Sequence, residues 1–375
     1  MQIPQRLLMG PGPSNVSPDV LAALAQPTIG HLDPVFQTMM EEVKDLLRYA
    51  FQTKNAMTFP ISAPASLAME SALVNLLEPG DTAIIAQNGV FGGRMAEIAE
   101  RAGARVKLIS FDWGAPVDPD AIAKALKCTP DAKLLAFVHA ETSTGVCSDA
   151  AALCQLARDA GLLTVVDTVT SLGGIPVDVD GWAADVVYSG TQKCMSAPPG
   201  LAPITFSEKA IAAIQSRKSK VQSWFSDLNL VLGYWSGEGG RSYHHTAPVN
   251  AIYGLHRALQ NLHDSGLEAR WQQHREVHER LAGGLDSLGL SFLVAPEHRL
   301  PQLNTIVVPH DIDEQAVRRV LLEDHSIEIG AGLGALAGKV WRIGLMGATA
   351  EPENADRLLN VLDRELQRQR RPAVA

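Results

Sequence analysis

The 375-residue sequence lacks the features of several large protein classes. It has no apolar run long enough to cross a bilayer, no signal-peptide core before the proline- and glycine-rich segment at residues 10–13, and no Gly-X-Y period. Its net charge is −9 and no large Lys/Arg cluster stands apart, which disfavours nucleic-acid binding. We therefore predict a cytoplasmic protein that binds neither membranes nor nucleic acid.

Cysteine is also scarce, with 4 residues and no CxxC spacing. A chain of this length needs no disulfide support, so we expect reduced thiols. Aromatic residues make up only 5% of the chain, but 46% of it is hydrophobic, which excludes intrinsic disorder. The length is ordinary for two domains.

Residues 60–210 alternate short β-rich runs with helical runs. This pattern predicts a mostly parallel sheet covered by helices on both faces. The expected strands are Thr82–Ile85, Val106–Ile109, Leu134–Val138, Leu163–Val166, Val186–Tyr188 and Ile204–Phe206. The expected helices include Ser66–Leu77, Gly92–Ala102, Pro119–Leu126 and Ala150–Ala160.

The pattern changes after about residue 250. Long helices with charged faces (Leu255–Leu262 and Leu267–Leu285) precede short strands and two further helices, which is typical of an α+β unit. The strands are expected at Leu290–Leu293, Asn304–Val308, Ile327–Ile329 and Lys339–Ile343, and the helices at Asp313–Glu323 and Glu351–Arg370. Residues 1–30 are rich in proline and glycine, and we expect them to form an arm that lies on the surface of some other element.

Polar residues follow three of the expected parallel strands. These segments are residues 139–145 (HAETSTG), 167–174 (DTVTSLGG) and 189–193 (SGTQK). In an open parallel sheet, ligands bind at the carboxyl ends of the strands, so one cavity would receive a carboxylate, several hydroxyls and Lys193. Each feature alone has an ordinary explanation, because a strand-ending Asp often caps a helix and a loop lysine is usually solvated.

Pyridoxal 5′-phosphate is the cofactor that uses such a set together. A lysine amine holds its aldehyde as a Schiff base, and a carboxylate keeps its ring nitrogen protonated so that the ring accepts electrons. Hydroxyls and a helix N-terminus suit its phosphate. A dinucleotide-binding protein on a doubly wound sheet is the alternative from another class, but no expected strand is followed by G-x-G-x-x-G.

The sequence resembles the class V aminotransferases of the fold-type I pyridoxal-phosphate enzymes, and among them the alanine–glyoxylate and serine–pyruvate (serine–glyoxylate) group. The joint order of the motifs carries the resemblance, which runs nearly end to end. The motifs are residues 8–15 (LMGPGPSN), 29–34 (IGHLDP), 70–81 (ESALVNLLEPGD), 141–145 (ETSTG), 166–174 (VDTVTSLGG), 188–193 (YSGTQK), 197–200 (APPG), 243–246 (YHHT), 332–334 (GLG) and 342–347 (RIGLMG).

The resemblance implies an α/β fold with a seven-stranded, mostly parallel sheet in a large domain and a smaller α+β C-terminal domain. We expect an N-terminal arm at residues 1–20, a large cofactor-binding domain at residues 21–255 and a small domain at residues 256–375. It also implies a homodimer with shared active sites.

The resemblance assigns roles residue by residue. Lys193 would be the Schiff-base lysine and proton carrier, and Asp167 the partner of the ring nitrogen. The other cofactor-binding residues would be Ala65, Ser66, Phe91, Thr142, Val169 and Gln192, with Tyr243 and Thr246 reaching into the partner's site. Arg342 would bind the substrate carboxylate, and the backbone of the arm near Gly12 would close over it. We assign no metal ligands. His31 is a candidate for lining the partner subunit's site, and His139 and Glu141 receive no role.

One motif departs from the family. A glycine-rich turn usually precedes the first large-domain helix, but residues 62–66 read SAPAS, and Pro64 has no N–H to donate. One backbone contact to the phosphate would be lost. Ser66, Gln192 and Thr246 of the partner subunit would then contribute more of the phosphate binding.

The resemblance implies ping-pong transamination between alanine or serine and glyoxylate or pyruvate. Related transaminases acting on ureidoglycine or 2-aminoethylphosphonate are the alternative, and a relative that has lost turnover stays open. A desulfurase or a lyase is disfavoured, because Cys194 directly follows the lysine and is better explained as a small packing residue. Should a dicarboxylic donor be preferred, Arg241 would be the candidate second cation.

Overall fold

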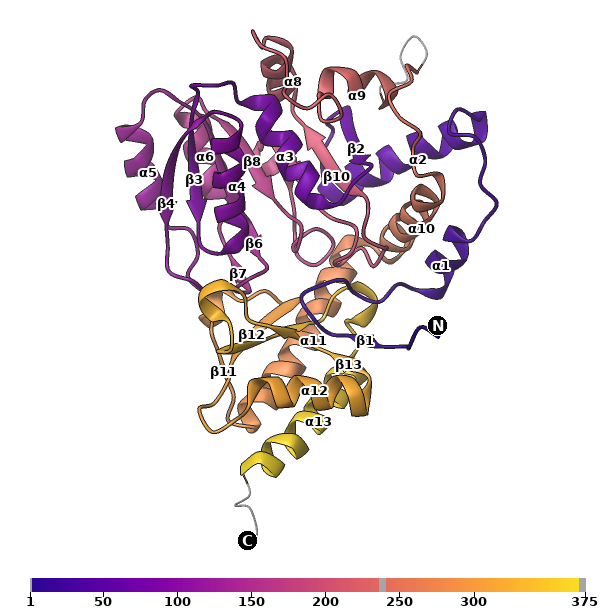
Figure 1. Cartoon of the computed structure of the whole chain (residues 1–375), viewed down its shortest axis with the longest axis vertical. Helices are drawn as coiled ribbons and strands as arrows, with labels where there is room; N and C mark the ends of the chain where they lie inside the picture. Colours follow the sequence, from indigo (N-terminus) through magenta and orange to yellow (C-terminus); the bar gives the residue numbers. More distant parts are fainter. Residues whose placement is uncertain (1, 236–240, 371–375) are drawn as a thin grey trace.

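The computed structural model describes residues 2–235 and 241–370. Figure 1 shows a large part built on one sheet and a smaller part below it, in orange and yellow. Among the described helices, none is both long and apolar enough to cross a bilayer. The cytoplasmic location stays a prediction.

A seven-stranded sheet forms the centre of the large part, as predicted. Its order is β2 (Met57–Ile61), β10 (Ala202–Phe206), β9 (Val186–Tyr188), β8 (Leu163–Asp167), β5 (Ala132–Val138), β3 (Thr82–Gln87) and β4 (Arg105–Ser110). The pairs from β9 through β4 are parallel, whereas β10 runs antiparallel to both of its neighbours. No helix separates β9 from β10, and a parallel strand would need such a crossover.

Helices cover this sheet on both faces. Every residue of β8 is buried, which its nearly continuous apolar sequence predicts for a strand with two covered faces. The expected helices are confirmed within one or two residues as α3 (Ala65–Leu76), α4 (Val90–Arg101), α5 (Pro119–Cys128) and α6 (Ala150–Asp159). Sequence reasoning missed β2 and the helices α2 (Pro34–Phe51), α8 (Glu208–Gln215) and α9 (Leu228–Trp235).

The N-terminal arm lies on the surface of this chain and contacts both of its parts. Strand β1 (Leu7–Leu8) pairs in parallel with β13 (Ile327–Glu328), and the short helix α1 (Pro18–Leu24) packs on α10 (Val249–Ser265). The backbone between them carries Gly12 to the site described below.

The smaller part is an α+β unit, as predicted. Its sheet has the order β11 (Ser291–Phe292), β12 (Leu303–Val307), β15 (Val340–Gly344) and β14 (Gly330–Ala331). The helices of this part are α11 (Leu267–Ser287), α12 (Glu314–His325) and α13 (Pro352–Arg370). The expected strand at Ile327–Ile329 is β13, which pairs with the arm instead of joining this sheet.

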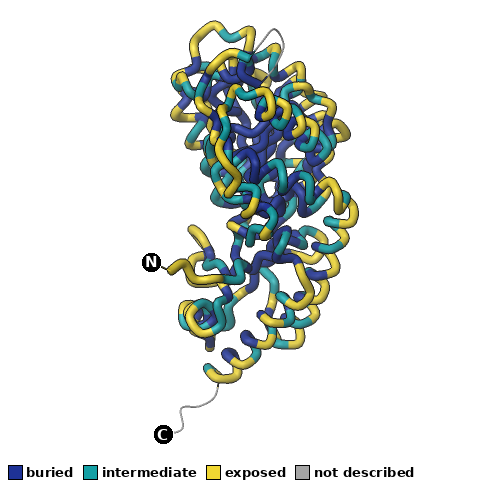
Figure 2. The backbone as a smooth tube through the Cα atoms, turned by 90° about the vertical axis from the view of Figure 1, so that its right-hand side faces the viewer, coloured by how far each residue is buried: buried dark blue, intermediate teal, exposed yellow. Residues whose placement is uncertain are grey.

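Two hydrophobic cores correspond to the two parts, and Figure 2 shows buried backbone running through both. The division into arm, large domain and small domain stays a proposal. A boundary after residue 255 lies within α10, whose apolar face (Leu255, Leu259 and Leu262) belongs to the large core. The second core includes residues of α11 from Val277 onward. A boundary inside α11 would therefore separate the two cores.

Candidate active site

A pocket lies at the carboxyl ends of β5, β8 and β9, where the sequence predicts it. Its lining contains every predicted cofactor residue except Tyr243 and Thr246, and it adds Arg94, which sequence reasoning missed. The lining residues are Pro64, Ala65, Ser66, Met69, Phe91, Arg94, Thr142, Asp167, Val169, Gln192 and Lys193.

Lys193 follows β9 and is buried, with 6% of its surface exposed. Its Nζ donates a hydrogen bond to the carbonyl of Pro11 in the N-terminal arm. Burial, aided by the positive charge of Arg342, lowers the pKa of Lys193 to about 8. A neutral amine, which is the nucleophilic form, is therefore accessible near neutral pH.

Gly12 approaches this lysine closely. Its φ is +103°, and a Cβ at this position would lie 2.5 Å from Cδ and 2.9 Å from Nζ of Lys193. A side chain at residue 12 would displace the amine, so the contact needs glycine.

Asp167 ends β8 and is buried beside Tyr188, its register partner on β9. One carboxylate oxygen accepts the N–H of Val169 at 2.8 Å, and the other accepts the hydroxyl of Tyr188 at 2.8 Å. Burial raises the pKa of Asp167 to about 6. A turn, not a helix, follows Asp167, so the explanation of this residue as a helix cap is wrong.

Arg342 extends from β15 of the smaller part and meets the loop after β5. Its Nη1 donates to the carbonyl of Thr142 at 3.0 Å, and its Nε donates to the carbonyl of Ala331 at 2.8 Å. Within the described residues it forms no ion pair, which argues against a structural salt bridge as its role. Burial lowers its pKa to about 10, so the guanidinium stays charged at neutral pH.

The other end of the pocket is formed by the first turn of α3, which begins at Ala65. No side chain of the described residues caps this turn, and Pro64 stands at the cap position. Gln192 lies close to this turn. A Cβ built on Gly190 would be 2.6 Å from Oε1 of Gln192 and 3.2 Å from Cβ of Ala65, so both side chains adjoin the same glycine. The first N–H groups of a helix have no intrahelical acceptor, so this end offers hydrogen-bond donors.

Glu141, to which the sequence assigned no role, contacts a residue of the pocket lining. It is fully buried, and its Oε2 accepts the N–H of Phe91 at 3.3 Å in the first turn of α4. Its Oε1 accepts both the N–H and the hydroxyl of Ser143, at 3.0 and 2.6 Å. Burial raises the pKa of Glu141 above its ordinary value.

Val169, like Phe91, is only partly buried, so both side chains reach the pocket surface.

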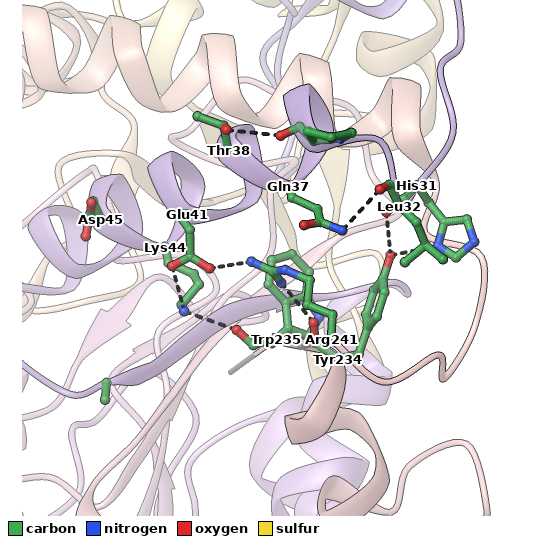
Figure 3. A network of polar contacts seen from close by, with 12 residues as sticks. His31, Leu32, Gln37, Thr38, Glu41, Lys44, Asp45, Tyr234, Trp235 and Arg241 are labelled. Atoms are coloured by element: carbon green, nitrogen blue, oxygen red, sulfur yellow. Dashed lines mark hydrogen bonds and ion pairs between the residues drawn. The ribbon is translucent and has the colours of Figure 1, made fainter. Parts of the chain in front are cut away.

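Tyr243 and Thr246 are exposed and lie outside this chain's pocket lining. The Tyr243 ring contacts His31, with 5.5 Å between the ring centroids, and His31 is 3.0 Å from the hydroxyl of Tyr234. Figure 3 shows the neighbouring network, in which Arg241 pairs with Glu41 and donates to the carbonyl of Tyr234 at 2.8 Å. Arg241 is thus already neutralised and does not serve as a free second cation.

The comparisons with known proteins agree with this geometry. Residues 11–358 match the family Aminotransferase class-V. The chain is 43% identical to the alanine–glyoxylate aminotransferase of Oryctolagus cuniculus over 97% of this chain and 93% of the relative. The crystal structure of alanine–glyoxylate aminotransferase from Nostoc sp. superposes with a TM-score of 0.95 at 45% identity, covering 98% of this chain and 96% of that one.

The chain belongs to the class V aminotransferases. A ureidoglycine–glyoxylate aminotransferase from Bacillus subtilis is also similar, with a TM-score of 0.96 at 37% identity over 100% of this chain and 96% of that one. The predicted family and the fold-type I architecture are confirmed, and the protein is a pyridoxal-phosphate-dependent aminotransferase.

The pocket of this class V aminotransferase fits that cofactor chemically. It brings together a buried amine of lowered pKa, a buried carboxylate and, at the far end, an uncapped helix start. Cys194 is the residue after Lys193 and is buried with Ala140 and Met346. Burial raises the pKa of Cys194 to about 12, so it stays a thiol. All four cysteines are free. His139 is buried, and burial lowers its pKa to about 4, so its ring is neutral.

Proposed function

We propose that this aminotransferase transfers the amino group of alanine or serine to glyoxylate, or to pyruvate, by a ping-pong mechanism. The position of Arg342 carries the proposal, because one buried guanidinium that donates to the carbonyl of the pocket residue Thr142 suits a single α-carboxylate. The names of the relatives from O. cuniculus and Nostoc sp. support alanine as the donor and glyoxylate as the acceptor. A ureidoglycine donor is the alternative, favoured by the similarity to the B. subtilis enzyme.

Three residues would carry the chemistry. When bound, pyridoxal phosphate supplies an aldehyde that accepts the amino group and a ring that takes up the electron pair released at the donor's α-carbon. Lys193 would hold the resting cofactor and then move the proton of the α-carbon with its Nζ, which a pKa near 8 suits. Asp167 would keep the ring nitrogen protonated, and Arg342 would orient the α-carboxylate.

The remaining residues would bind and orient. Ala65, Ser66 and Gln192 would donate to the phosphate at the first turn of α3, where the helix dipole favours an anion. Phe91 and Val169 would enclose the ring from its two faces, and Thr142 would lie near the ring oxygen. The arm at Gly12 would cover the substrate carboxylate and exclude water.

A donor-by-acceptor activity panel tests the substrate proposal. We expect alanine or serine to be the best donor, with glyoxylate preferred over 2-oxoglutarate. Because Arg241 is already paired with Glu41, a second carboxylate in aspartate or glutamate would find no free cation beside Arg342, and its burial there would lower kcat/KM by a factor on the order of 10² to 10³. Arg342→Ala should lower kcat/KM for all donors alike. The proposal fails if aspartate or glutamate has the highest kcat/KM, or if ureidoglycine exceeds both alanine and serine.

The shared-site homodimer is a further part of the proposal. It is supported by the exposure of Tyr243 and Thr246, which match a family motif yet lie away from the pocket of their own chain. Each would complete the cofactor site of the partner subunit.

Mixing two inactive variants tests the shared site. A Lys193→Ala chain and a Tyr243→Ala/Thr246→Ala chain would form one intact site in each mixed dimer, so unfolding and refolding them together should restore about a quarter of the parent activity per site. Refolding either variant alone is the control. Failure of the mixture to exceed the two separate variants would contradict shared sites.

A further inference from the structure

Arg94 brings a positive charge into the cofactor pocket that neither the family motifs nor the proposed roles use. It lies on α4, one turn after Phe91, and lines the pocket together with Ala65, Ser66 and Gln192. Its Nη1 donates to the hydroxyl of Ser66 at 2.9 Å, and its guanidinium carbon lies 4.8 Å from the centroid of the Phe91 ring. The two contacts fix the side chain between the aromatic ring and the start of α3.

No carboxylate neutralises this arginine among the described residues. The cations of α2 and the other arginine of α4 show the contrast, since Lys44 pairs with Glu41 and Arg101 pairs with Glu97. Arg94 instead lies against the first turn of α3, which carries the positive end of the helix dipole. Two positive groups side by side repel each other, so an anion between them would stabilise the arrangement.

The anion most consistent with this position is the phosphate of the cofactor. Pro64 stands at the cap of α3 and supplies neither an N–H nor a side-chain donor, so this turn is short of one phosphate contact. A guanidinium donates through a planar fork that matches phosphate oxygens. We propose that Arg94, held by Ser66 and Phe91, binds the phosphate of pyridoxal phosphate and replaces the contact missing at Pro64.

This inference rests on the proposal that the first turn of α3 receives the phosphate. The competing occupant is the side-chain carboxylate of a dicarboxylic donor. The contact with Ser66 favours the phosphate, because it ties the guanidinium to the first turn of α3, whereas Arg342 reaches the site at Thr142.

Cofactor affinity, not turnover, is the measurement that separates these possibilities. Full-length protein stripped of cofactor would be titrated with pyridoxal phosphate and, separately, with pyridoxal, which has the same ring and aldehyde but no phosphate. Binding would be followed by the absorbance of the bound cofactor and by quenching of tryptophan fluorescence. Arg94→Gln is the test variant, and Arg101→Gln is the matched control on the same helix, outside this pocket.

We expect Arg94→Gln to raise the Kd for pyridoxal phosphate by about 10- to 100-fold, as for loss of a charge-assisted contact, and to change the Kd for pyridoxal by less than about threefold. Arg94→Lys should lie between Arg94→Gln and the parent, because it keeps the charge but loses the fork. Inorganic phosphate should compete with pyridoxal phosphate less well in Arg94→Gln than in the parent. Arg101→Gln should match the parent in every titration.

Three results would overturn the inference. Equal losses for both ligands would mean that Arg94 only supports Phe91 and Ser66. Unchanged affinity for pyridoxal phosphate, with a raised KM for aspartate or glutamate alone, would assign Arg94 to a substrate carboxylate. If Gln192→Ala weakens pyridoxal phosphate but Arg94→Gln does not, only the Arg94 inference fails, and if neither variant weakens it, the placement of the phosphate at α3 fails as well.

Discussion

Replacing Lys193 by alanine is expected to abolish transamination and the visible absorbance of the covalently held cofactor together. Among the residues that the structure describes, no other lysine lines the pocket, so no second amine is placed to take over the bond. The same amine is proposed to move the α-proton, and loss of both functions should lower kcat by a factor on the order of 10⁴ or more.

The measurements are steady-state activity, the absorbance spectrum and thermal unfolding. Lys209→Ala is a suitable control, because Lys209 is another lysine of the large part that donates to a backbone carbonyl, that of Leu162, but lies outside the pocket. We expect the control to keep parent-like activity and both variants to stay folded. Lys193→Ala protein with parent-like turnover would remove the basis of the proposed mechanism.

Much of the architecture was predictable because the pattern of apolar residues indicates which faces of an element are buried. A run such as residues 163–166 is nearly continuously apolar, and the corresponding strand is buried along its whole length. The direction of β10 was not predictable from its own residues. Direction depends on whether the connection crosses the sheet, and the loop between β9 and β10 holds the lysine segment instead of a helix.

The site was predictable where its residues follow strands, because the carboxyl ends of parallel strands share one edge. Asp167 and Lys193 are brought into one pocket in this way. Glu141 and Arg94 were missed as contributors, since their positions depend on how α4 packs beside β5. The available signal for Arg94 was its spacing three residues after Phe91, which places both on one face of a helix.

Asp167→Asn is expected to leave the fold intact and to slow the half-reaction with alanine by a factor on the order of 10³. The substitution keeps the shape of the side chain but removes the negative charge proposed to hold the ring nitrogen protonated. An unprotonated ring accepts electrons poorly, so the loss should appear in the rate of the half-reaction, with a smaller loss in cofactor affinity.

The pKa of Asp167 explains why the folded protein should tolerate this change. Burial raises that pKa from 3.8 to about 6, so the carboxylate ionises at a higher pH in the folded protein than in the unfolded chain. As pH rises from about 4 through about 6, the cofactor-free folded state therefore loses stability relative to the unfolded state, and a neutral asparagine avoids that loss. Thermal unfolding of cofactor-free protein at pH 8 should accordingly show no large decrease for Asp167→Asn.

The matched control is Asp185→Asn, a buried carboxylate beside the same sheet that accepts the N–H of Thr164 and lies outside the pocket. Because the contacts of Asp185 with Thr164, Ser207 and Lys209 lie outside the pocket, its replacement should lower thermal stability while leaving the half-reaction rate near that of the parent. Tyr188→Phe keeps the charge of Asp167 but removes one hydrogen bond to it, so its rate should fall between those of Asp167→Asn and the parent. If Asp167→Asn reacts as fast as the parent, Asp167 contributes only its contacts with Val169 and Tyr188, and the protonated ring nitrogen must be maintained by another group.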